Sequence, residues 1–267
     1  MLTDYLLSIA AGAIQGVTEF LPISSSGHLV LFHNLFSLVE NNLAFDVALH
    51  FGTLAALVWY FKEDVINYIQ GWLKSLSRFD WQKPEQKIPW LIILATLPAV
   101  IFALYAENSI ELIFRNNLSV ATMLIAFGVL LILADQFSQK KFDITNLGIA
   151  AALFIGVAQS LALIPGVSRS GITIIAALAV GLKRFEAAKF SFLLGIPILL
   201  AAFLKKLTDL NAYNNNDLVL VILGVLSSAI VGYLVIKYFL KLLQKKSLKI
   251  FGWYRIALGL FILILLL

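Results

Sequence analysis

The chain contains no cysteine, so it has no disulfide bond, no thiol nucleophile and no cysteine-based metal site. Charge is also scarce: 13% of the 267 residues are charged, whereas a soluble domain has about a quarter. The N-terminus has no basic region or small-residue cleavage site, so we expect no signal peptide. Hydrophobic residues make up 61% of the sequence, and the mean hydropathy is +0.93. This composition predicts an all-α polytopic membrane protein.

Apolar runs divide the chain into long and short segments. Six of them have close to the roughly 20 apolar residues that a helix needs to cross a bilayer. These are residues 44–61, 88–106, 118–137, 186–204, 217–239 and 249–267. Four shorter runs form two pairs, 5–21 with 27–37 and 146–163 with 170–182, each interrupted by a serine, glycine and proline string. Because such strings stop helices, we interpret each pair as a re-entrant hairpin of two half-helices.

The two interrupting strings resemble each other at an offset of 144 residues. At this offset Gln15 aligns with Gln159, Ser24 with Ser168, Ser26 with Ser170 and Gly27 with Gly171. Polar residues within apolar segments are energetically costly and therefore indicate a function. Their duplication predicts one site built from two halves of the chain.

The duplication also predicts the architecture. A single membrane domain, residues 1–267, divides into halves 1–143 and 144–267, each a hairpin followed by three spans. Since three is odd, the second half enters the membrane upside down. This predicts an inverted repeat, an arrangement that places binding sites near the bilayer midplane.

Basic residues predict the orientation. The loops expected on one face carry fourteen lysines and arginines, whereas the other face carries three. The positive-inside rule places the basic face in the cytoplasm and both termini outside. Residues 64–77 then form a helix on the cytoplasmic surface. Topology thus accounts for the net charge of +5, and we expect no nucleic-acid partner.

Gln15 and Glu19 are four residues apart and share a helix face. Gly12 and Gly16 form a GxxxG pattern on the adjoining turn, which allows a neighbouring helix to approach closely. A buried acid that only supports packing is the alternative for Glu19, but acids at membrane depth usually serve function. Its carboxylate is also an oxygen ligand suited to a divalent cation.

Hydroxyl groups follow Pro22 in the first string. Ser24, Ser25, Ser26 and Gly27 precede a predicted helix, where hydroxyls and backbone N–H groups can cradle an anion. The simpler alternative is an ordinary serine N-cap. The second string repeats the arrangement, which favours the anion site.

Arg169 is the strongest single indication of function. It lies in the sequence Pro165-Gly166-Val167-Ser168-Arg169-Ser170-Gly171, between two apolar arms. A guanidinium there requires an anion, and phosphate matches its planar donor fork. A structural salt bridge to Glu19 is the alternative, and the two can coexist.

His28 is the candidate acid or base, with a satisfied interhelical donor as the alternative. His50 and Asp46, again four apart, are either a support for the site or a structural pair. Together, a carboxylate, an arginine, a histidine and several hydroxyls suit hydrolysis of a phosphate ester held at the membrane, assisted by a cation.

At these residues the chain resembles the undecaprenyl-diphosphate phosphatase family, the BacA type. The first family motif is matched by Gln15, Glu19, Phe20, Leu21, Pro22, Ser24, Ser25, Gly27 and His28. The second, Pro-Gly-x-Ser-Arg-Ser-Gly-x-Thr, is matched by Pro165, Gly166, Ser168, Arg169, Ser170, Gly171 and Thr173. The chain departs from the family at Gln15, a position often occupied by glutamate, and at His50, where many relatives have glutamine.

The resemblance implies hydrolysis of undecaprenyl diphosphate to the monophosphate and phosphate, which recycles the lipid carrier for cell-wall synthesis and confers bacitracin resistance. It implies a multi-pass protein of the bacterial plasma (inner) membrane, with the site facing outside and a dependence on Mg²⁺ or Ca²⁺. Membrane lipids and a second copy in a homodimer are the other expected partners.

We assign catalysis to Glu19, Ser25, His28 and Arg169, with His28 oriented toward Ser25 and Glu19 acting as base or metal ligand. Whether Ser25 attacks phosphorus or positions a water stays open here. Substrate binding is assigned to Gln15, Ser24, Ser26, Gly27, Gly166, Ser168, Ser170 and Thr173. Transport of undecaprenyl phosphate, alone or besides hydrolysis, is the alternative function, because broken helices in inverted repeats are typical of transporters. A structural scaffold leaves Arg169 and Glu19 unexplained.

Overall fold

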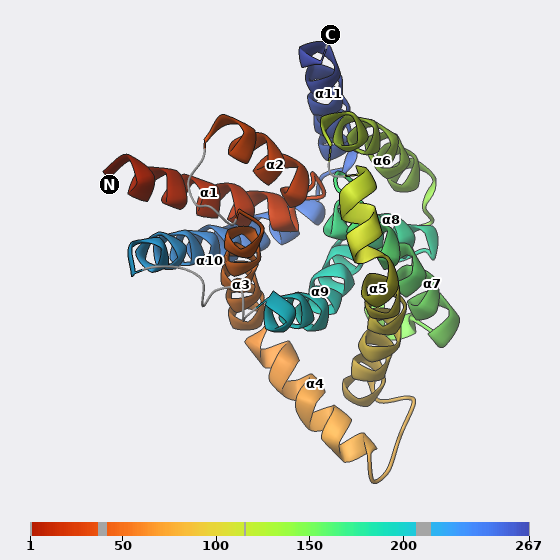
Figure 1. Ribbon diagram of the computed structural model, residues 1–267. Helices are drawn as coiled ribbons and strands as arrows, with labels where there is room; N and C mark the ends of the chain where they lie inside the picture. Colours follow the sequence, from red (N-terminus) through yellow and green to blue (C-terminus); the bar gives the residue numbers. More distant parts are fainter. Residues whose placement is uncertain (1, 37–41, 115, 207–214, 267) are drawn as a thin grey trace.

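A computed structural model describes residues 2–36, 42–114, 116–206 and 215–266. Within these ranges the chain is helical, and its one β-bridge joins Phe142 to Leu182. Figure 1 shows a bundle in which helices far apart in sequence lie together. The elements are α1 Leu2–Phe20, α2 Ser25–Leu35, α3 Asn42–Tyr60, α4 Lys62–Ser75, α5 Pro84–Phe114, α6 Asn117–Phe137, η1 Ile144–Asn146, α7 Ile149–Ser160, η2 Leu161–Leu163, α8 Arg169–Ala179, α9 Arg184–Lys206, α10 Asn215–Leu243 and α11 Lys249–Leu265.

All six predicted spans coincide with helices. Four of them, α5, α6, α9 and α10, are long and apolar enough to cross a membrane. α3 meets that criterion only together with α4, from which it is bent by 80°, and α11 has 17 residues. The chain is therefore a polytopic helical membrane protein. The number of spans stays a prediction.

The predicted interruptions lie where the strings are. Eleven-residue helices follow both strings, because α2 begins at Ser25 and α8 begins at Arg169, 144 residues later. The segment before the first string is longer than expected, since α1 has 19 residues. α8 is buried over most of its length. This short helix is therefore surrounded by protein, as a helix that ends within a membrane must be.

Small residues bring pairs of helices into close contact. A Cβ on Gly16 of α1 would lie 2.8 Å from Ser228 O of α10, and one on Gly156 of α7 would lie 2.7 Å from Ala95 Cα of α5. Lipid is as apolar as a leucine side chain, so such close backbone packing is a main attraction between helices in membranes. The close approach predicted for Gly12 and Gly16 is confirmed.

A cluster of aromatic side chains joins three helices beneath the first string. The ring of Phe192 in α9 lies 5.4 Å from that of Phe20 in α1 and 6.1 Å from that of Phe239 in α10. Phe20 and Phe192 are fully buried. This packing fixes the end of α1, and with it Glu19, against α9.

α4 is bent sharply from α3. Its residue range, Lys62–Ser75, nearly coincides with the surface helix predicted at 64–77. It exposes Ile66, Ile69 and Leu73, while Gly71 is buried against Glu85 at the start of α5. Figure 1 shows α4 at the edge of the bundle, beside the start of α5.

Candidate active site

The two strings fold into matching turns. Ser24 and Ser168 are the N-caps of α2 and α8, with φ of 76° and 71°, a region that residues other than glycine rarely occupy. Each Oγ accepts a hydrogen bond from the glycine N–H three residues on, at 3.3 Å from Gly27 and 3.1 Å from Gly171. Backbone strain of this kind is held by surrounding structure and clusters at functional sites. The duplicated sequence therefore gives duplicated geometry.

Glu19 lies between the two turns, with 4% of its side chain exposed. Its Oε1 is 2.6 Å from Arg169 Nη2. Its Oε2 accepts hydrogen bonds from Ser25 Oγ at 2.8 Å and from Gln15 Nε2 at 3.1 Å. A buried carboxylate is tolerable only with such partners. The Glu19–Arg169 pair, weighed above as an alternative to phosphate binding, is thus present, and it joins the two strings.

Arg169 is held in place by α9. Its Nη1 donates to Ser191 O at 3.0 Å, and the guanidinium lies against Gly195, where a Cβ would come within 2.7 Å of Cζ. Its Nε is buried and has no hydrogen-bond partner within the described ranges. The guanidinium therefore has a fixed position and an unused donor, which an anion could satisfy.

A cavity of about 240 Å³ opens beside these groups, and we call it the polar cavity. Its lining combines polar and charged residues with apolar ones, which suits a ligand with a charged head and a hydrocarbon tail. Its lining consists of Glu19, Ser25, Ser26, His50, Ala99, Gln159, Ala162, Leu163, Ser168, Arg169, Ile198, Leu199 and Ala202.

The predicted site residues divide between the cavity wall and its supports. Glu19, Ser25, Ser26, Ser168 and Arg169 line the cavity. The others do not line it: Gln15 supports Glu19, Ser24 and Gly27 form the first turn, and Gly166 and Ser170 belong to the second.

Thr173 also lies away from the cavity wall and is fully buried. Its Oγ1 donates to Arg169 O at 2.8 Å and lies 2.6 Å from Ser191 Oγ. In this position it braces α8 against α9.

His28 does not point toward Ser25, so the predicted orientation is wrong. Its Nδ1 lies 2.7 Å from Ser24 O, and its Nε2 lies 2.7 Å from Tyr254 Oη in α11. Because a carbonyl oxygen only accepts, Nδ1 carries a proton and the neutral ring accepts from the tyrosine at Nε2. The rotation of α2 turns His28 toward α11 and away from the cavity.

His50 lies in the cavity wall instead. Its Nδ1 donates to Asp46 O at 2.7 Å, which leaves Nε2 facing Glu19 Oε2 at 3.5 Å. The Asp46 carboxylate lies 2.7 Å from His33 Nε2. Of the two alternatives for His50, support of the site is the one this geometry favours.

Two polar residues of the site were not assigned from sequence. Gln159 lines the cavity, donates to Ala95 O at 3.4 Å and has a buried Oε1 without a partner in the described chain. Arg255, fully buried in α11, bonds to both strings. Each interrupts an apolar segment, and that signal could have identified them.

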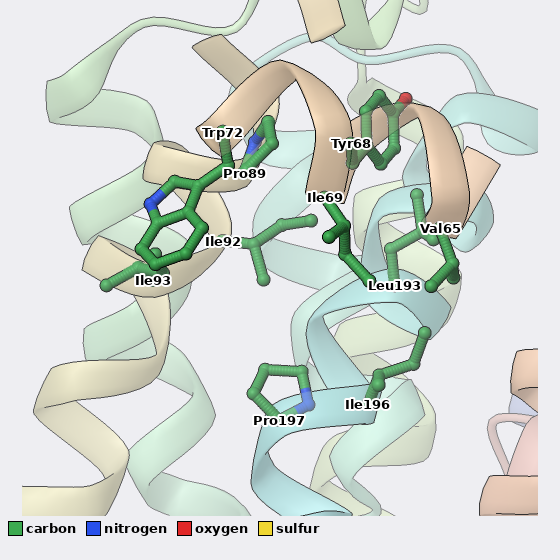
Figure 2. A pocket seen from close by; sticks show the side chains of 10 residues that line it. All are labelled: Val65, Tyr68, Ile69, Trp72, Pro89, Ile92, Ile93, Leu193, Ile196 and Pro197. Carbon is green, nitrogen blue, oxygen red and sulfur yellow. The ribbon is translucent and has the colours of Figure 1, made fainter. Parts of the chain in front are cut away.

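A second cavity, of about 260 Å³, lies between α4, α5 and α9, and we call it the apolar groove. Figure 2 shows Ile92, Ile93 and Leu193 around it, with Pro197 below and Trp72 at one side. The groove is lined by no carboxylate, arginine or histidine among the described residues. It therefore lacks the groups that phosphate chemistry needs.

The family model "Bacitracin resistance protein BacA" matches residues 8–261. The chain belongs to the BacA family. A relative of this BacA family member named "Undecaprenyl-diphosphatase", from Trichlorobacter lovleyi, is 44% identical over 98% of the chain and 97% of the relative. One of the same name from Methanobrevibacter smithii is 40% identical over 94% of each. "Undecaprenyl-diphosphatase 2" from Stutzerimonas stutzeri is 44% identical over 98% of each.

Proposed function

We propose that the chain hydrolyses undecaprenyl diphosphate to undecaprenyl phosphate and inorganic phosphate. The observation that carries the proposal is the chain of contacts from Ser25 Oγ to Glu19 (2.8 Å) and on to Arg169 (2.6 Å) at the wall of the polar cavity. A hydroxyl hydrogen-bonded to a carboxylate beside a fixed guanidinium is an activated nucleophile next to an anion site. The names of the relatives support the same reaction.

The diphosphate binds where the two turns face each other. Arg169 offers its guanidinium, and the hydroxyls of Ser26 and Ser168 line the same cavity. Phosphate oxygens accept strongly from such donors. The helix N-termini that begin at Ser25 and Arg169 add partial positive charge. Charge on the departing phosphate is stabilised by the same groups.

Ser25 is the proposed nucleophile. Glu19 takes the Ser25 proton while Oγ bonds to the terminal phosphorus, the bond to the prenyl phosphate oxygen breaks, and Glu19 passes the proton to the departing prenyl phosphate. Water then attacks the phosphoserine as Glu19 takes a proton from it, and Glu19 gives that proton to Ser25 Oγ as phosphate leaves. Acid quenching during turnover and mass spectrometry should find phosphate on Ser25. A phosphate-free Ser25 at every quench time would favour direct attack by water.

A divalent cation fits this donor set. Gln15 Oε1 is buried without a partner in the described chain, and it lies on the side chain that bonds Glu19. Both offer oxygen ligands, and Mg²⁺ in proteins commonly has one or two carboxylates and takes its other ligands from substrate phosphates and water. Glu19 and Gln15 would hold the cation, which would neutralise phosphate charge when bound.

The apolar residues that line the polar cavity, which include Leu163 and Leu199, suit the first isoprene units of the lipid. Surrounding membrane lipids and, in a homodimer, a second copy are the other proposed partners. Transport is the alternative function for an inverted repeat, and the names of the relatives favour hydrolysis over it.

We infer an inverted repeat in the bacterial plasma membrane, with both termini and the polar cavity facing outside. The matching turns at Ser24 and Ser168 support two related halves, and α1 packs on α10 as α7 packs on α5. Because the chain has no cysteine, Thr3→Cys and Gln139→Cys give single reporters at exposed positions. An impermeant maleimide applied to intact cells should label position 3 and spare position 139. The opposite pattern would reverse the orientation.

The direct test of the proposed function is phosphate release from undecaprenyl diphosphate by the purified protein in detergent, where no sidedness exists. We expect saturable release, lost in a folded Arg169→Ala variant. Activity of that variant near wild type would remove the phosphate-binding role of Arg169.

A further inference from the structure

Arg255 is a fully buried arginine in α11, within a 17-residue apolar helix. Within the described ranges it has no ion pair, and its donors go to backbone carbonyl groups instead. A guanidinium without a carboxylate in such a place is expensive, and its hydrogen bonds must compensate for the lost water. The identity of those carbonyls indicates its role.

The carbonyls belong to both strings. Nη1 donates to Pro22 O at 3.2 Å, and Nη2 donates to Gly166 O and Val167 O at 2.9 Å each. Pro22 and Gly166 are 144 residues apart, so they are the same position in the two strings. A third helix enters the network because Nε donates to Leu124 O of α6 at 3.4 Å.

These carbonyls directly precede the groups of the site. Pro22 and Gly166 each lie two residues before the N-cap serine of their turn. The residue after the N-cap serine is Ser25 in the first turn and Arg169 in the second. One rigid guanidinium therefore sets the separation of the two turns. Through them it sets the separation of the hydroxyl from the anion-binding arginine.

We propose that Arg255 is a positioning residue that holds the two half-sites in register for the reaction. The expected fall in kcat rests on the proposed function. The expected change in the spacing of the two turns rests on their geometry alone. A displacement of about 1 Å between reacting groups can lower turnover by about 100-fold. Lysine would keep the charge but lacks the planar fork that reaches both strings.

Gly171 of α8 supplies a second way to test the network. A Cβ at this position would lie 2.8 Å from Arg255 Nη1 and 3.1 Å from Ser168 Cβ. Gly171→Ala therefore displaces the guanidinium without removing it. Gly148→Ala is the matched control, because its Cβ would meet nothing within 4 Å.

The experiment compares wild type, Arg255→Gln, Arg255→Lys and Gly171→Ala in phosphate release from undecaprenyl diphosphate. Arg184→Lys is the control for an arginine of another network, since Arg184 pairs with Asp135. A second measurement reports on the turns directly. In the cysteine-free chain, spin labels at Leu35→Cys and Ala179→Cys mark exposed ends of α2 and α8.

We expect kcat to fall by about 100-fold in Arg255→Gln and by at least about tenfold in Arg255→Lys and Gly171→Ala, with KM within about threefold. The label distance should broaden or shift in the same variants and stay unchanged in both controls. A kcat near wild type in Arg255→Lys would overturn the proposal. So would lost turnover with an unchanged label distance.

The two hypotheses fail separately. If wild type releases no phosphate, the proposed function fails, and the label distances still decide whether Arg255 holds the turns together. If Arg255→Gln does not fold, Arg255→Lys and Gly171→Ala carry the same test.

Discussion

The Glu19–Arg169 pair predicts a specific pattern of stability and activity. Its side chains are 4% and 12% exposed, and their charged atoms are 2.6 Å apart. Removing one partner of a buried pair costs about 3–5 kcal/mol, because the other charge stays buried alone. Arg169 keeps its bond to Ser191 O and some exposure, so we expect about 3 kcal/mol for Glu19→Gln.

Removing both charges should recover part of that loss. Because Glu19→Gln together with Arg169→Met leaves no unpaired charge, the double variant should be at least about 2 kcal/mol more stable than the sum of the single effects predicts. Activity should behave differently. Each single change removes a group of the reaction and lowers kcat by about 100-fold or more, and the double variant stays inactive.

The assay is unfolding of the four proteins in one detergent, with phosphate release measured on the same samples. The partly exposed pair of Asp64 and Lys189, 2.7 Å apart, is the control. Its coupling should be below about 1 kcal/mol, with turnover unchanged. Additive stability losses at Glu19 and Arg169 would refute a buried, mutually dependent pair.

Three further predictions concern the surroundings of the cavity. Gly195→Ala should lower kcat by at least about tenfold and also lower thermal stability, because its Cβ displaces the Arg169 guanidinium from its buried pair with Glu19. Unchanged kinetics and stability would place the guanidinium elsewhere. His50→Ala should lower kcat by about tenfold or more, because His50 faces Glu19 in the cavity wall. Tyr254→Phe should leave kcat within about threefold of wild type, because Tyr254 contacts His28 away from the cavity. The reverse ranking would indicate that His28, not His50, is the acid or base. EDTA should stop phosphate release by the wild type, and added Mg²⁺ or Ca²⁺ should restore it. The same ions should not restore activity in Glu19→Gln. Full wild-type activity in EDTA would exclude a role for the cation.

Local sequence determined much of the fold. The run predicted at 118–137 is the helix Asn117–Phe137, because an apolar stretch in a membrane must satisfy its own backbone. The helix breaks fall at the Ser24 and Ser168 strings, where serine caps and glycines compete with a continuous helix. Conformation at these positions depends on near neighbours in the chain.

The rest depended on contacts between distant segments. Glu19 meets Arg169 across 150 positions, and duplicated motifs were the only local indication that they meet. The direction of His28 depends on how α2 is rotated and on Tyr254, 226 positions away. Arg255 carries no motif, so only its isolation in an apolar run marked it. Side-chain direction and long-range partners are properties of the packed bundle.

The most direct test of a single site built from two halves is phosphate release by two variants, Ser25→Ala from the first half and Arg169→Ala from the second. The purified proteins would be compared with wild type on undecaprenyl diphosphate, in detergent with Mg²⁺ or Ca²⁺ added. We predict that wild type releases phosphate and that each variant, still folded, is slower by about 100-fold or more. A variant that turns over near the wild-type rate would show that its half of the chain does not contribute to the reaction.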